Sequence, residues 1–313
     1  MGRLGVLGAG AGSGAAAAAL YLVVLTGSPG AMILAYLSQL PLFAAGLWLG
    51  TPAAVAAGLT AIAVLFAAGG TTAAALYAGL YAVPIMLLVR QALLARRTAD
   101  GALEWYPPGL LAVWLTALGL LVLAGAVLFF GGPAGLQALM RESLAPALGR
   151  LIDEPKASEP LVDVIALVAP GAIAASWMIM TASNAILAQG LLARFGAAWR
   201  PSPDLAALGL PMWFSGLLAI AAGLAMVAGG PRFVGVNLLI VLSVPFCLAG
   251  LAVVHTAVRR WPRPQVPLVA FYVLASLFGW PLLVVTALGV LDAPLGLRRR
   301  LAPPASVGGP IDD

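Results

Sequence analysis

Residues 109–130 read GLLAVWLTALGLLVLAGAVLFF, a run of 22 residues without a charged side chain. A transmembrane helix needs about 20 mostly apolar residues to cross a bilayer core of roughly 30 Å. The backbone polar groups of a segment in lipid must also be satisfied within the protein, which favours a helix over an open strand. This run therefore predicts a membrane-spanning helix.

The rest of the chain has the same character. Of its 313 residues, 62% are hydrophobic and only 9% are charged, and the mean hydropathy is +1.05. Soluble domains average about 45–50% apolar and about 25% charged residues. The composition therefore excludes a water-soluble globular protein and indicates an integral membrane protein.

Further charge-poor apolar runs predict the other helices. Together with the first, they cover residues 5–26, 31–50, 52–69, 71–89, 109–130, 164–193, 208–229, 234–258 and 267–291. We expect an all-α, polytopic transmembrane bundle of about eight or nine helices. The run 5–26 is interpreted as a retained first helix, because a cleaved signal peptide should precede a soluble mature protein.

The longest connection between these runs, residues 131–163, has a pattern of its own. Its apolar residues recur near helical spacing from Leu136 to Ile152, while Arg141 and Glu142 lie on the opposite face, which is typical of a helix lying in the membrane interface. We expect one membrane domain over residues 1–300 and a disordered tail over 301–313. An alternative is a six-helix module over 1–193 followed by carboxy-terminal helices over 204–291.

The chain has 16 Lys and Arg residues against 11 Asp and Glu. They lie in short gaps between the runs and not on a face that could follow phosphates, so no nucleic-acid partner is expected. Cytoplasmic loops are enriched in Lys and Arg, but nine spans would place the Arg298–Arg300 cluster opposite the other arginine-rich loops. Either one run is not a span, or the last run is broken at Trp280–Pro281, where proline removes a backbone donor.

Catalytic and metal-binding patterns are missing from the sequence. Nearly every ionisable residue lies outside the runs, and none of the Asp, Glu, Lys or Arg residues lies within them, which disfavours an ion-driven pump or antiporter. The single cysteine, Cys247, excludes disulfides within the chain and Cys-based metal sites. His255 is either a polar ligand contact or a histidine at the headgroup level. We expect no enzyme, no metal and no cofactor.

A few polar residues inside the runs are candidates for binding a substrate. Asn184 lies in the longest run, and a pocket formed by Asn184, Trp177 and Gln39 could hold a small, largely uncharged molecule. The same run contains Pro170–Gly171, and transporters build substrate sites at broken helices. The alternative is that these amides form ordinary hydrogen bonds between helices.

The first run is rich in small residues. Gly14, Ala15 and Ala19 belong to a stretch in which small residues recur at four-residue spacing, which lets helices approach closely. This face could dock a membrane partner subunit. The alternative is packing within the bundle itself.

Several segments together resemble a known family. They are Pro41 to Gly50, Asn184 to Arg194, Asn237-Leu-Leu-Ile-Val-Leu-Ser, Gly250-Leu-Ala-Val-Val-His255, Phe271-Tyr272, Pro281, Gly289-Val-Leu-Asp292 and Leu297-Arg298-Arg299-Arg300. Over most of its length the chain resembles the YybS-like family of bacterial polytopic membrane proteins, a domain of unknown function. That family is similar in pattern to the substrate-binding membrane subunits of energy-coupling-factor transporters.

The resemblance implies a multi-pass protein of the bacterial inner membrane, in contact with membrane lipid. Small-molecule uptake or solute binding is the leading function, with energy supplied by membrane partner subunits and a separate ATPase. In that case the first six runs correspond to the substrate-binding module, and the alanine-rich first helix to its partner-docking face. The alternative is a non-transporting scaffold for cell-envelope or division machinery.

Overall fold

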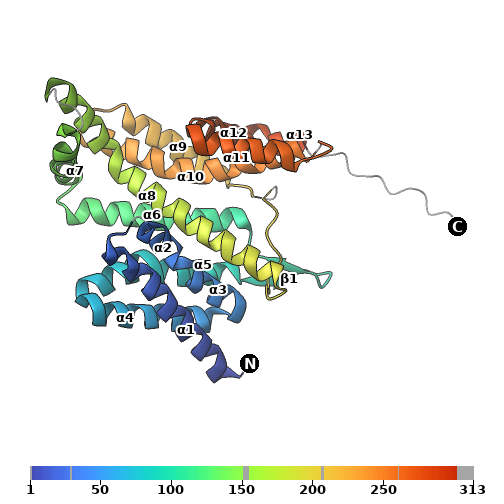
Figure 1. Ribbon diagram of the computed structural model, residues 1–313. Helices are drawn as coiled ribbons and strands as arrows, with labels where there is room; N and C mark the ends of the chain where they lie inside the picture. Colours follow the sequence, from blue (N-terminus) through green and yellow to red (C-terminus); the bar gives the residue numbers. More distant parts are fainter. Residues whose placement is uncertain (1, 29, 151–154, 206–207, 260, 302–313) are drawn as a thin grey trace.

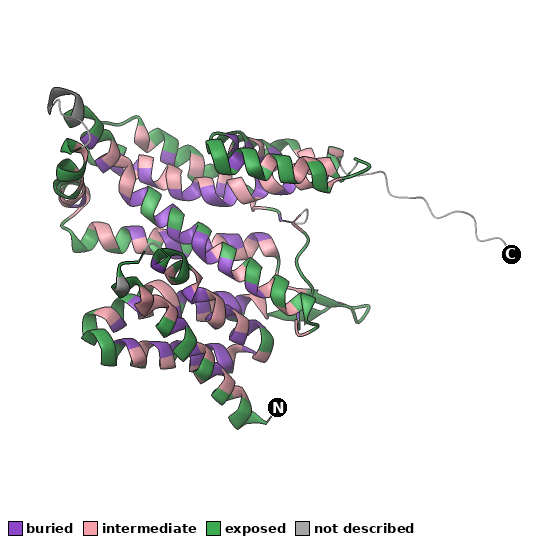
Figure 2. Cartoon of the chain, viewed as in Figure 1, coloured by how far each residue is buried: buried purple, intermediate pink, exposed green. Residues whose placement is uncertain are grey.

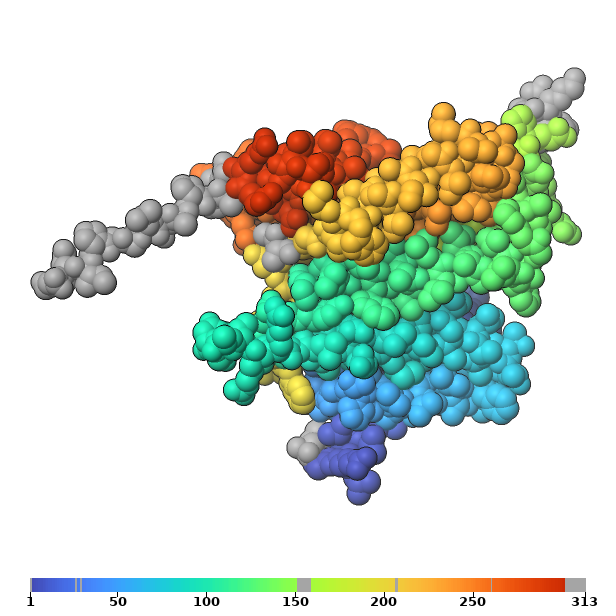
Figure 3. All heavy atoms as spheres, turned by 180° about the vertical axis from the view of Figure 1, so that it is seen from behind, coloured from blue at the N-terminus to red at the C-terminus, as the bar shows by residue number. Residues whose placement is uncertain are grey.

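The computed structural model describes residues 2–28, 30–150, 155–205, 208–259 and 261–301, and its helices are stacked in layers (Figure 1). Helices α1–α5 form one layer, α6 and α8 lie in the middle, and α9–α13 form the layer on the other side. The view from behind shows the same order (Figure 3). The all-α membrane fold predicted from the apolar runs is confirmed.

The amino-terminal layer contains the elements α1 (Arg3–Leu22), η1 (Val23–Thr26), α2 (Ala31–Tyr36), η2 (Leu37–Gln39), α3 (Leu40–Leu49), α4 (Thr51–Tyr77), the π-helical η3 (Ala78–Ala82) and α5 (Val83–Ala92). Gly70 interrupts α4 with non-helical angles, φ 74° and ψ −169°. A Cβ on Gly58 would lie 2.7 Å from Met86 Cε, although along a straight helix these residues would be about 42 Å apart. The chain therefore folds back at Gly70, where the sequence predicted a boundary between two runs.

The next segment contains two short strands, which were not predicted from the sequence. Strands β1 (Ala95–Arg97) and β2 (Leu103–Trp105) form an antiparallel hairpin before α6 (Pro108–Phe129). Asp100–Gly101 forms its turn, with Gly101 at φ 85° and the Thr98 hydroxyl donating to the Asp100 carboxylate. An Asp-Gly pair is a common hairpin signal, so the sequence did carry this information.

The long connection contains a helix, as its amphipathic pattern predicted, although Ile152 at the end of that pattern lies outside the described residues. Helix α7 (Pro133–Gly149) packs against the amino-terminal half of α8 (Pro155–Arg194), and Arg141 pairs with Asp163 at 2.8 Å. Leu136 is buried while Arg141 and Glu142 are exposed. Because α8 has 40 residues, it contacts α10 around Gly171 and also reaches α2 and α3, which joins the outer layers.

The carboxy-terminal layer contains α9 (Met212–Ala225), α10 (Gly230–Val258), α11 (Gln265–Phe278), α12 (Pro281–Leu295) and α13 (Leu297–Leu301). The expected span 208–229 is reduced to the 14 residues of α9, because Pro211 precedes its first turn. The expected span 267–291 is broken, since α11 and α12 are bent by 116° at the Gly279–Pro281 break. Figure 2 shows that α11 remains mostly exposed.

By length and hydropathy, six helical segments in the described part of the chain could cross a membrane, or seven if the bent α11–α12 pair counts as one. The expected number of eight or nine is therefore not reached by this measure. One of the six segments, Thr51–Ala92, is the one that folds back at Gly70. Of the expected tail, residues 302–313 lie outside the described residues.

Small residues bring α1 and α4 into close contact. A Cβ on Gly10 would lie 2.6 Å from the Ala53 carbonyl oxygen, and one on Gly14 would lie 2.9 Å from the Ala57 carbonyl carbon. These pairs share four-residue spacing, so the two helices run side by side in the same direction. Gly14 therefore packs inside the bundle.

A buried amide joins α10 to α8. Asn237 Nδ2 donates to the Leu167 carbonyl at 2.9 Å, and Asn237 Oδ1 accepts from the Gly171 amide at 2.5 Å. In a regular helix these two backbone groups, four residues apart, would bond to each other. Pro170 lies between them and has no N–H, so the side chain of Asn237 supports α8 where its backbone is weakest.

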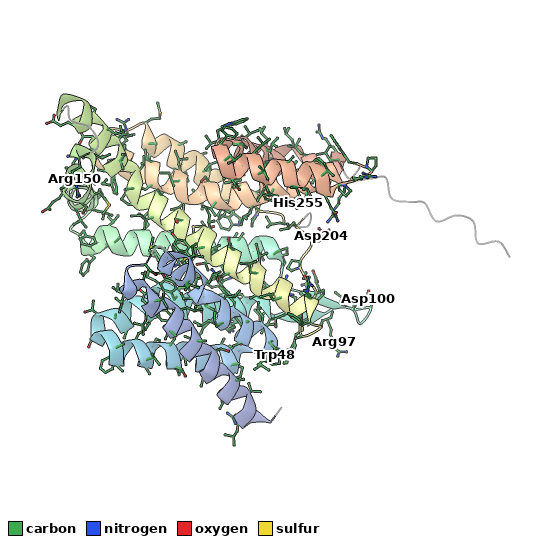
Figure 4. All side chains as sticks on the ribbon, viewed as in Figure 1. Trp48, Arg97, Asp100, Arg150, Asp204 and His255 are labelled. Atoms are coloured by element: carbon green, nitrogen blue, oxygen red, sulfur yellow. The ribbon has the colours of Figure 1, made fainter. Side chains whose placement is uncertain are left out.

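The two ends of the bundle differ in charge. Hydrogen bonds from Arg200, Arg259 and Arg298 join the interhelical loops at one end, which we call the arginine-rich end. The described arginines at this end include Arg90, Arg96, Arg97, Arg194, Arg200, Arg259, Arg263, Arg298, Arg299 and Arg300, whereas Arg141, Arg150 and Arg232 lie at the other end. Figure 4 shows Arg97 and His255 at one end and Arg150 at the other. The broken last run thus returns Arg298–Arg300 to the other arginine-rich loops.

Candidate binding site

Asn184 lies where α8 meets the α2–η2 segment. It is buried, and its Nδ2 donates to the carbonyls of Tyr36 at 2.8 Å and Met180 at 2.9 Å, while its Oδ1 has no hydrogen-bond partner among the described residues. Asn184 and Tyr36 border a groove of about 500 Å³. Since Ile179 and Leu187, which also line it, are exposed, the groove opens to the outside of the bundle.

The structure does not bring Trp177 and Gln39 to this groove. Trp177 Nε1 donates to the Leu80 carbonyl at 2.8 Å, which ties α8 to η3. Gln39 is fully buried in η2, and neither atom of its amide has a partner among the described residues. The three residues lie in the same part of the bundle but do not line one common pocket.

His255 lies near the end of α10. Its Nε2 is 2.9 Å from the Tyr272 hydroxyl of α11, and the ring is partly buried. Arg259, one turn later, pairs with Asp204 at 2.6 Å. His255 therefore lies at the arginine-rich end, away from the groove next to Asn184.

The small residues of α1 point in two directions. Gly14 is buried against Ala57, whereas Ala15 and Ala19 are exposed. Gly8 and Gly12 lie on the same exposed face, and a Cβ on either would meet nothing within 4 Å. The predicted docking residues thus divide between packing inside the bundle and a free face.

The sequence analysis did not identify the most enclosed polar side chain of the loops. Arg200 follows α8 and is only 5% exposed. It lines a second cavity, of about 350 Å³, between α3, α5, α6 and α8. In the sequence this arginine lies in a loop between two apolar runs. It is buried only because the loop folds back over the ends of the helices.

The walls of this cavity are almost entirely apolar. Phe43, Leu88, Leu111 and Leu115 are among the side chains that line it. Thr181 lies at the deep end, where its buried hydroxyl has no partner among the described residues. The polar residues Gln189, Arg200 and Ser202 lie at the other end.

A second buried charge, Asp292, lies at the end of α12. Its carboxylate accepts from Arg298 Nε at 2.8 Å and from the Arg298 amide at 3.0 Å, while Arg298 Nη1 donates to the Leu208 carbonyl. The sequence analysis noted this Asp-then-Arg element without assigning it a role. In the structure it fastens α13 to the loop before α9.

Metal-binding geometry does not occur in the described part of the chain, where no three His, Cys, Asp or Glu side chains come together. The polar side chains of the cavity instead supply two hydroxyls, an amide and a guanidinium. These groups suit the binding of an organic molecule by hydrogen bonds and charge.

Comparison with known proteins gives a family but no further relative. No curated protein and no solved structure matches the chain significantly. The model of a family described as "Predicted membrane protein (DUF2232)" matches residues 15–293, which is most of the chain and includes all the expected membrane runs apart from the start of the first. The chain therefore belongs to the DUF2232 family of membrane proteins.

Proposed function

We propose that this protein binds a small molecule within its membrane bundle and acts in the uptake of that solute. The observation that supports this proposal is the cavity of about 350 Å³ between α3, α5, α6 and α8. Ligand pockets are usually concave and apolar with a few placed polar groups, and have volumes of about 300–1,000 Å³. The site residues we assign are Thr181, Gln189 and Arg200.

The site proposed here lies on a different face of α8 from the one expected around Asn184. Both Asn184 donor bonds go to backbone carbonyls, so this amide already has a structural role. Thr181 and Gln189 lie on the same α8 face, which borders this cavity. Exposed Ile186 also lines it, so the cavity is partly open to the outside of the bundle.

Uptake requires an energy source, and we assign it to partners, as in energy-coupling-factor transporters. The exposed small-residue face of α1, which includes Ala15 and Ala19, is the surface we assign to a membrane partner. A separate ATPase would then act through that partner. The binding protein itself would have no enzymatic role.

We also propose that the protein lies in the bacterial inner membrane with its arginine-rich end in the cytoplasm. Many more of the described arginines lie at that end than at the end that contains Arg141 and Arg232. Short cytoplasmic loops carry an excess of Lys and Arg. Both termini would then be cytoplasmic.

A scaffold role is the second candidate. The groove next to Asn184 supports it, because it is open to the outside and apolar, and could receive a helix of another membrane protein. A scaffold of this kind would need no enclosed cavity. The two functions therefore differ in whether a small molecule occupies the bundle.

Native mass spectrometry of the protein extracted from its host in mild detergent tests the proposal. Ala185 lines the cavity, so Ala185→Phe fills it, whereas Ala193→Phe places the same ring on an exposed position of α8. We expect a small molecule to be released from the wild type and from Ala193→Phe, but not from Ala185→Phe. Release of lipid alone from all three proteins would refute solute binding and favour the scaffold.

A further inference from the structure

Arg200 is held in place by three hydrogen bonds. Its Nη1 donates to the Ala92 carbonyl at 2.9 Å, and its Nη2 donates to the Tyr106 carbonyl at 2.8 Å. Gln189 Nε2 donates to the Arg200 carbonyl at 2.7 Å. These bonds join the ends of α5 and α8 to the connection before α6, so the guanidinium has a fixed position.

The charge of Arg200 is not compensated by any described carboxylate. Its two acceptors are neutral carbonyls, and a guanidinium has five N–H donors, so three donors have no acceptor among the described residues. Asp204, the nearest acidic residue along the chain, pairs with Arg259 at 2.6 Å. Burial lowers the pKa of Arg200, which reflects the cost of enclosing a cation without a counter-charge.

The cavity has a polar end and an apolar end. From Gln189, beside Arg200, it extends along α8 to Thr181, a distance of about 12 Å at the helical rise of 1.5 Å per residue. Beyond the polar end its walls are apolar apart from the Thr181 hydroxyl. A small soluble anion would leave this apolar part without a partner, whereas a molecule with an apolar chain would fill it.

We propose that the ligand is an anionic amphiphile with one apolar chain, whose carboxylate or phosphate group binds Arg200 while the chain lies between α3, α5, α6 and α8. This inference rests on the proposed function and gives the chemical class of its solute. Guanidinium groups bind carboxylates and phosphates through paired, charge-assisted hydrogen bonds. The hydroxyl of Ser202 lines the same polar end and is a further donor.

The volume argues for a single chain. About 350 Å³ lies at the lower end of the range for ligand pockets, so a lipid with two acyl chains would not be enclosed. The polar end also lies at the arginine-rich end of the bundle. An amphiphile in the membrane leaflet on that side would therefore present its headgroup at the depth of Arg200.

Binding of defined probes to the protein in zwitterionic lipid nanodiscs tests this inference. We would titrate decanoate, decyl phosphate, decanol and decyltrimethylammonium, and measure bound probe by native mass spectrometry. We expect saturable binding of decanoate, decyl phosphate or both, at least 10-fold tighter than binding of decanol or the cation. A charged hydrogen-bond partner contributes enough to account for about a 10- to 100-fold difference in affinity.

Variants separate the contribution of the charge from that of the fold. Arg200→Gln should lose about 10-fold or more in decanoate affinity. Arg200→Lys keeps the charge but not the paired bonds, so it should lose less than Arg200→Gln. The exposed Arg194→Gln on α8 should bind like the wild type. If Arg200→Gln fails to elute as a monodisperse protein, Ala185→Phe provides the second test. It leaves Arg200 intact and should abolish binding of decanoate.

The outcomes distinguish this inference from the proposed function. Equal binding of decanol and decanoate, both lost in Ala185→Phe, would overturn the anionic class but support a solute site. Binding of decyl phosphate without decanoate would assign the headgroup to a phosphate. Failure of all four probes to bind the wild type would overturn the inference, while a different co-released molecule from the host would still support the proposed function.

Discussion

Replacing Gly14 with alanine should weaken the contact between α1 and α4. The added Cβ would overlap the Ala57 carbonyl oxygen and lie 2.9 Å from both the Ala57 carbonyl carbon and Thr60 Cβ. Carbon atoms in contact prefer separations of about 3.5–4.0 Å, so the helices must move apart by at least about 0.6 Å. A gap of that size removes about a quarter of the attraction between each pair of atoms across the interface.

Gly12 on the same helix provides the control. It is exposed, and a Cβ there meets nothing within 4 Å. Both substitutions gain the roughly 0.5–1 kcal/mol by which alanine favours a helix over glycine. That gain cancels in the comparison, so Gly14→Ala should be less stable than Gly12→Ala by about 1–3 kcal/mol, the usual cost of overpacking.

The free energy of unfolding can be measured by titrating SDS into detergent micelles that contain each purified variant and following the loss of helical structure by circular dichroism. We expect Gly12→Ala to match or exceed the wild type and Gly14→Ala to unfold at a lower SDS fraction. Equal stability of the two variants would refute the close packing of α1 on α4. In that case Gly14 would be free to contact a partner protein, as Ala15 and Ala19 are.

Three other experiments test other parts of the structure. Gly171→Ala brings a Cβ to 2.8 Å from Asn237 Oδ1, so the protein should unfold about 1–3 kcal/mol more easily; a wild-type SDS midpoint would refute the amide contact. Two cysteine substitutions, each made in a variant without the native cysteine, test the proposed orientation with the arginine-rich end in the cytoplasm. Ala102→Cys should react with an impermeant maleimide only in inverted vesicles, and Ala138→Cys only in right-side-out vesicles. The reverse pattern would refute this orientation. Asp292→Asn leaves a mostly buried arginine without its counter-ion, so the unfolding free energy should fall by about 3 kcal/mol, and an unchanged value would show that the ion pair does not stabilise α13.

The helical membrane fold was predictable because it depends on local properties. An apolar run such as 109–130 must form a helix in lipid whatever its neighbours are, and α6 occupies 108–129. The pattern around Leu136 and Arg141 likewise predicted α7. The hairpin at Asp100–Gly101 was predictable in principle, because its turn signal is also local.

Helix lengths and breaks were less well determined by the sequence. Hydropathy alone did not distinguish the 14-residue α9 from a full span, and it left open whether the last run was broken. The bend between α11 and α12 decides that question, because it returns the chain to the end of the bundle at which α11 begins. The distribution of Lys and Arg among the loops was uninformative for this reason, since its interpretation assumed that every run crosses the membrane.

The candidate site depended most on tertiary structure. The sequence drew attention to Asn184 because an amide in an apolar run is unusual, but its neighbours were decided by how α8 packs against η2. Arg200 carried no local signal, since an arginine in a loop is ordinary. Its burial results from contacts with Ala92 and Tyr106, which are about 100 residues away in the chain.

The sequence by itself therefore determined that this protein is a helical membrane protein. Each apolar side chain favours lipid over water, and each backbone polar group in lipid needs a hydrogen bond within the chain, whatever the rest of the fold is. Tertiary structure decided which polar groups are enclosed, which glycines touch a neighbouring helix and at which end the arginines gather. These properties depend on distances between segments far apart in the chain. A cavity with a buried cation at one end can therefore be recognised only in the folded molecule.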